Sequence, residues 1–87
     1  MDYYMLAFTS THAAISAQAL LEPICPVRAM PVLRQVSSGC GIALRVPPAA
    51  LSAVRAALAA SPLAPSEYAL YAVTGSGPGL KAEPLSL

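Results

Sequence analysis

Residues 42–46 read Ile-Ala-Leu-Arg-Val, in which large apolar side chains alternate with a small one and a charged one. Successive side chains of a β-strand point to opposite faces of a sheet. We therefore predict a strand here, with Arg45 facing away from an apolar core. The core-facing side chains are those of Ile42, Leu44 and Val46.

A second apolar segment, residues 27–33, predicts the strand that precedes this one in the chain. Pro31 within it has no N–H to donate to a neighbouring strand, so it belongs at a sheet edge or at a strand end. Residues 34–41 are more polar and connect the two strands. The sequence thus predicts a β-hairpin that spans residues 27–46.

Two helices and two further strands are predicted outside this hairpin. Residues 3–8 (YYMLAF) are typical of a buried strand, and residues 12–21 form a helix behind the capping hydroxyls of residues 9–11. The second helix follows Pro47-Pro48, buries Leu51, Val54 and Leu58, and ends at Ser61-Pro62. Residues 67–73 form the last strand.

The resulting order is β-α-β-β-α-β, which is the pattern of the split βαβ, or ferredoxin-like, α+β fold. Right-handed crossovers would place both helices on one face of a four-stranded antiparallel sheet. The other face would then be open, and we expect it to form a homodimer interface. Residues 1–73 make up this single domain, and the Gly- and Pro-containing residues 74–87 are predicted to be a flexible tail.

The composition excludes several function classes. Only 10% of the 87 residues are charged and the net charge is +1, so no basic patch predicts a nucleic-acid partner. No apolar run is long enough for a transmembrane helix, and the first residues lack the basic start of a signal peptide. We expect a cytoplasmic protein. Two cysteines and one histidine, widely spaced, form no zinc motif, and no cofactor motif is present.

Cys40 is the leading candidate for chemistry. It lies in the polar segment Ser37-Ser38-Gly39-Cys40-Gly41, where glycines on both sides allow open turns and close approach. Successive backbone N–H groups in such a turn can bind an anion, and Arg34 or Arg45 could add positive charge to stabilise a thiolate. The competing interpretation is that Cys40 is only a small residue that fills a tight turn.

Other residues could assist Cys40. His12, at the start of the first helix, could move a proton, because the first strand ends where the strand of residues 42–46 begins. Arg34, Ser37, Ser38, Gly39 and Gly41 are candidates for binding an anion or a partner.

Cys25 is predicted to be a structural, half-buried thiol rather than a partner of Cys40. In the predicted hairpin the two cysteines lie at opposite ends, roughly 25 Å apart at about 3.3 Å per strand residue. A disulfide needs Cα atoms within about 7 Å of each other. We therefore expect no bond between them.

Three segments resemble the putative selenium/sulfur carrier protein-like family, a group of small bacterial domains. They are Ser10-Thr11-His12-Ala13-Ala14, Pro26-Val27-Arg28 with Met30-Pro31, and Arg34-Gln35-Val36-Ser37-Ser38-Gly39-Cys40-Gly41-Ile42-Ala43-Leu44-Arg45. The chain departs from the family pattern at Ala13 and Gln35, where the family often has acids, and at Cys25, where it commonly has glycine.

This resemblance implies that Cys40 carries sulfur or selenium, as a persulfide or selenide, between donor and acceptor proteins. Such a protein is a carrier rather than a stand-alone enzyme. Two other functions remain open at this point: a non-catalytic, dimeric regulatory or interaction module, and a thiol redox sensor.

Overall fold

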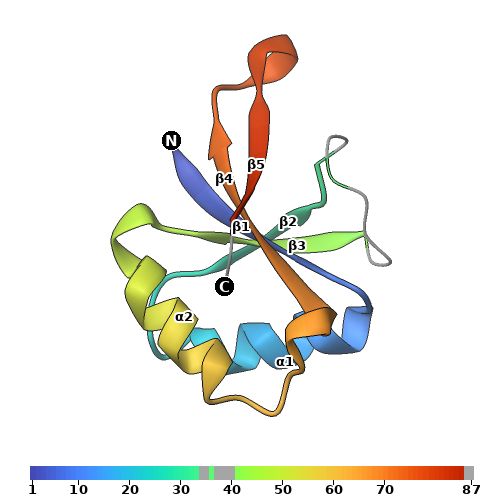
Figure 1. The fold of residues 1–87 in the computed structure, drawn as a ribbon, viewed down its shortest axis with the longest axis vertical. Coiled ribbons are helices and arrows are strands. Elements are labelled where there is room, and N and C mark those ends of the chain that lie inside the picture. The colour runs from blue at the N-terminus through green and yellow to red at the C-terminus, as the bar shows by residue number, and fades with distance from the viewer. Residues whose placement is uncertain (34–35, 37–40, 86–87) are drawn as a thin grey trace.

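The computed structural model describes residues 1–33, 36 and 41–85. The elements follow one another as β1 (Tyr3–Phe8), α1 (Thr11–Leu21), β2 (Arg28–Pro31), β3 (Ile42–Val46), α2 (Leu51–Ala59), β4 (Tyr68–Thr74) and β5 (Lys81–Leu85). Figure 1 shows both helices on one side of the sheet. The α+β class predicted from the sequence is confirmed.

The strands form one antiparallel sheet in the order β2-β3-β1-β4-β5. The prediction of four strands is wrong, because residues 81–85, expected in a flexible tail, pair with β4 as a fifth strand. The glycines that suggested flexibility instead build the turn between β4 and β5. Gly75 and Gly77 have φ of 81° and 59°, which is backbone that favours glycine. The carboxylate of Asp2 accepts the Gly75 N–H at 2.7 Å and holds this turn against the start of β1.

The helices and one face of the sheet enclose the larger apolar core. α1 begins behind Ser10, whose hydroxyl accepts the Ala13 N–H at 3.1 Å, as the capping hydroxyls predicted. α2 buries Val54 and Leu58. The buried sheet residues in this core are Leu6, Phe8, Leu44, Val46, Tyr68 and Leu70.

The middle of the second face of the sheet is also buried, so the prediction that this face is open is wrong for that region. Met5, Ala43 and Val73 on this face have no exposed surface. These three residues and Val36 belong to a second apolar cluster, and half-buried apolar residues pack against this cluster. Those half-buried residues are Met30, Val32, Leu33, Tyr71, Leu80 and Ala82.

The outer strands of the sheet are β2 and β5, and each contains a proline, Pro31 and Pro84. The prediction for Pro31 is confirmed, because β2 lies at an edge and ends at this residue. The next N–H, that of Val32, points toward the neighbouring strand and donates to the carbonyl of Gly41, the residue just before β3. Because successive N–H groups of a strand point in opposite directions, the ring nitrogen of Pro31 faces the free edge.

Candidate functional site

The two ends of the segment that contains Cys40 are joined to each other. The Val32 N–H donates to the Gly41 carbonyl at 3.1 Å, one pair beyond the last β2–β3 partners, Pro31 and Ile42. Five of the predicted site residues lie outside the described residues. They are Arg34, Ser37, Ser38, Gly39 and Cys40.

Val36 anchors this segment to the second face of the sheet. Its side chain is 6% exposed and belongs to the cluster that contains Met5 and Val73. Its N–H donates to the Leu33 carbonyl at 3.0 Å. Sequence reasoning missed this anchor, although an apolar residue in a polar connection was the available signal.

Gly41 is exposed and directly follows Cys40 in the chain. Among the described residues, nothing lies within 4 Å of a Cβ added to Gly41. What Gly41 contributes here is the carbonyl that accepts the Val32 N–H.

His12 is exposed on the first turn of α1, at the same end of the sheet as Gly41. Ala7 pairs with Ala43, so the end of β1 leads into α1 beside the start of β3 (Figure 1). The chain therefore brings the start of α1 and the start of β3 to one end of the sheet, as the sequence predicted.

Cys25 is a free, half-buried thiol in the connection between α1 and β2. It packs against the helix-side core, and its N–H donates to the Leu21 carbonyl at 3.1 Å. Burial raises the pKa of the Cys25 thiol, because desolvation penalises the charged form. Since the thiolate is the nucleophile, Cys25 is a poor nucleophile near neutral pH.

A shallow apolar hollow of about 280 Å³ lies beside Gly41, at the junction of β2 and β3. Ile42 lines it and is 38% exposed, although the alternation in residues 42–46 predicted a buried side chain. Ile42 lies past Ala43, the last β3 residue paired with β1, so only β2 flanks it. The other lining residues are Ala29, Met30, Pro31 and Gly41.

The described part of the chain holds neither a cluster of metal-ligating side chains nor a helix that could cross a membrane. Across residues 1–33, 36 and 41–85, no group of three His, Cys, Asp or Glu side chains could hold a metal ion. None of the helices in those same residues has the length and apolar character needed to cross a membrane.

Residues 3–69 match the family model described as "Putative Se/S carrier protein-like", and the chain belongs to this family. The match includes the whole segment from β2 to β3 and therefore Cys40. β5 lies outside the matched residues. No curated protein and no solved structure matches the chain.

Proposed function

We propose that this protein carries sulfur or selenium on the thiol of Cys40 and passes it between partner proteins. The observation that carries this proposal is the family match, which includes Ser37-Ser38-Gly39-Cys40-Gly41. The burial of Cys25 is consistent with it, since a raised pKa makes that thiol a poor nucleophile near neutral pH.

Loading is a thiol exchange that needs no added oxidant. The Cys40 thiolate attacks the outer sulfur of a donor persulfide, R–S–SH. A new S–S bond forms, the donor S–S bond breaks, and R–S⁻ leaves with the electron pair. The product is Cys40–S–SH. A donor R–S–SeH gives Cys40–S–SeH by the same balance, and attack by an acceptor thiolate on the outer atom unloads it.

The residues around Cys40 have distinct roles in this proposal. Arg34, with the hydroxyls of Ser37 and Ser38 and the N–H groups of Gly39 and Gly41, would hold the anionic persulfide. His12 would exchange a proton with the thiol. The exposure of His12 and its place at the Gly41 end of the sheet support that role.

The apolar hollow beside Gly41 is the surface that we assign to the donor and acceptor proteins. Its lining residues Met30 and Ile42 flank the ends of the Cys40 segment. We do not place a homodimer on the middle of the second sheet face, because the chain's own apolar side chains cover that region. A bacterial cytoplasm suits the proposed chemistry, since thiols stay reduced there.

We further assign β1 to β4 and the two helices to a ferredoxin-like arrangement with β5 as an added edge strand. The strand order β2-β3-β1-β4 and the element order β-α-β-β-α-β support this assignment. The family match ends within β4, which also sets β5 apart.

The test is mass spectrometry of the intact protein after incubation with a cysteine desulfurase and cysteine. We expect the wild type and Cys25→Ser to gain the mass of one sulfur atom, which reductant removes, and Cys40→Ser to gain none. No gain by the wild type, or an equal gain by Cys40→Ser, would refute the proposal. Sulfenylation of Cys40 by peroxide in a protein that cannot be loaded would favour the redox sensor instead.

A further inference from the structure

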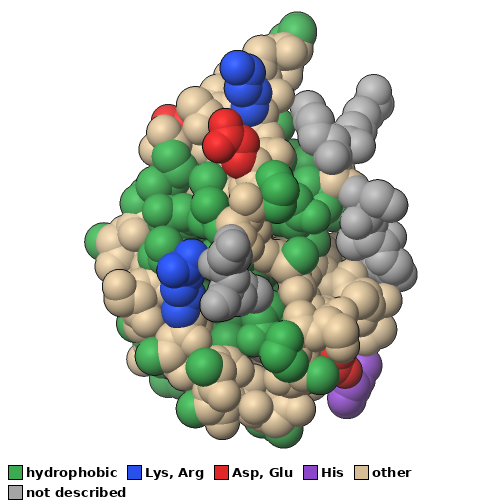
Figure 2. All heavy atoms as spheres, viewed as in Figure 1, with side chains coloured by type: hydrophobic (Ala, Val, Ile, Leu, Met, Phe, Trp, Pro, Cys, Tyr) green, Lys and Arg blue, Asp and Glu red, His purple; other side chains and the backbone are tan. Residues whose placement is uncertain are grey.

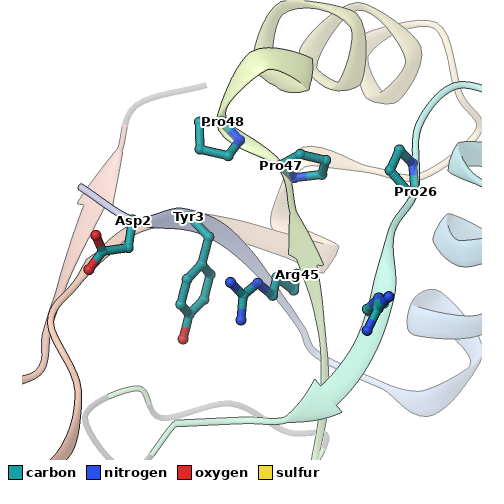
Figure 3. A pocket seen from close by; sticks show the side chains of 7 residues that line it. Asp2, Tyr3, Pro26, Arg45, Pro47 and Pro48 are labelled. Carbon is teal, nitrogen blue, oxygen red and sulfur yellow. The ribbon is translucent and has the colours of Figure 1, made fainter.

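A second candidate site lies at the end of β3 that is remote from Gly41. It is a cavity of about 270 Å³ on the second face of the sheet. Two arginines, Arg28 of β2 and Arg45 of β3, line it together with the ring of Tyr3 (Figure 3). The family resemblance and the proposed role of Cys40 leave this cavity without a function.

The two arginines are forced together by the register of the sheet. Arg28 and Arg45 are direct partners across the β2–β3 pair. Side chains of directly opposed residues lie on the same face, with Cβ atoms about 5 Å apart. Like charges in this relation destabilise a sheet, so the arrangement has a cost that a bound anion would remove.

The cavity's only acid among the described lining residues does not neutralise this pair. Asp2 uses its Oδ2 to accept the Gly75 N–H at 2.7 Å. Figure 3 shows its carboxylate pointing away from Arg45, with Tyr3 between them. Two positive charges therefore share the cavity with one carboxylate that is already engaged elsewhere.

The site is also partly organised before a ligand arrives. The guanidinium carbon of Arg45 lies 4.2 Å from the centre of the Tyr3 ring, which is a cation–π contact. Pro26, Pro47 and Pro48 complete the wall. Proline rings fix φ, so these wall segments lose little freedom when a ligand binds. The cavity volume is about nine times the volume that one water molecule occupies in liquid water. This is enough space for an anion that carries a small organic group.

From these features we propose that the cavity binds the phosphate group of a small molecule, either inorganic phosphate or a phosphate monoester. A tetrahedral dianion offsets both positive charges and offers enough oxygens for two guanidinium forks. A monocarboxylate has one charge and two oxygens, which a single arginine already satisfies. The proposal concerns a different region from Cys40 and stands apart from sulfur carriage.

The test is a titration of the ¹⁵N-labelled full chain, followed by ¹H–¹⁵N spectra at constant ionic strength. The probes are inorganic phosphate, phenyl phosphate and acetate. We expect phosphate to shift the amides of Tyr3, Arg28 and Arg45, with a Kd of about 1–10 mM for an exposed site. Tighter binding of phenyl phosphate would identify an ester as the ligand, and tighter binding of inorganic phosphate would identify the free ion.

Two variants with the same charge change make the result decisive. We expect Arg28→Gln to raise the Kd for phosphate about fivefold or more, because one of the two charge-assisted contacts is lost. Arg55→Gln, on α2 at the helix side of the sheet, should keep the Kd within about twofold since only long-range charge changes. The spectra themselves report whether each variant is folded. Equal weakening by both variants, shifts outside the cavity, or acetate binding as tightly as phosphate would overturn the proposal.

Discussion

Replacing Val36 by alanine tests whether the Cys40 segment is fixed to the sheet. Val36 is 6% exposed and belongs to the cluster of Met5, Ala43 and Val73. The substitution removes two buried carbons, each contributing about 0.8 kcal/mol, so the free energy of unfolding should fall by about 1.6 kcal/mol. In a domain of this length, that loss corresponds to a fall in Tm of roughly 6–13 °C.

Urea unfolding measures the loss, and native-state hydrogen exchange locates it. The Val32 N–H, bonded to the Gly41 carbonyl, should exchange faster in Val36→Ala than the global change explains. The matched control is Val54→Ala, which deletes the same carbons from the helix-side core. It should lower global stability without a separate effect on the Val32 amide. Surface substitutions usually change the free energy of unfolding by less than about 0.5 kcal/mol. A loss that small for Val36→Ala would refute the interpretation that Val36 anchors the segment.

Three further predictions concern stability. Ser10→Ala removes the oxygen that accepts the Ala13 N–H and should cost about 1 kcal/mol in urea unfolding, whereas Ser10→Asp should keep most of it. Burial raises the pKa of Cys25, so the stability from its neutral thiol is present at low pH and is lost as pH rises above about 8.5; Cys25→Ala should flatten that fall, and an unchanged slope would contradict the burial. Deleting residues 81–87 removes β5 and should lower the free energy of unfolding in urea by about 1–3 kcal/mol, while the amides of β1–β4 stay dispersed in NMR spectra.

Local sequence patterns predicted most helices and strands because each of those patterns is compatible with only one kind of element. The alternation in residues 42–46 correctly predicted that Leu44 and Val46 are buried, and Pro31 correctly predicted an edge strand. The fifth strand was missed because the glycines that precede it fit both a flexible tail and a tight turn. The pairing of residues 81–85 with β4 distinguishes the two, and so does the Asp2–Gly75 hydrogen bond, which joins residues 73 positions apart.

The candidate site was only partly predictable for the same reason. Chain order was enough to bring His12 and Gly41 to one end of the sheet. The burial of Val36 depends on a sheet face built from β1, β3 and β4. The pairing of Arg28 with Arg45 depends on register, since a slip of one residue would put them on opposite faces.

The prolines of the two outer strands bear on how this chain avoids aggregation. An exposed sheet edge offers free N–H and C=O groups to a second chain, and proteins often block such edges with charged side chains. Charges are scarce here, and Figure 2 shows much apolar surface between them. Pro31 and Pro84 instead remove a donor from each outer strand. Replacing them by residues with an N–H would restore a donor to each outer strand, and the chain would then pair more readily with the strand edge of another chain.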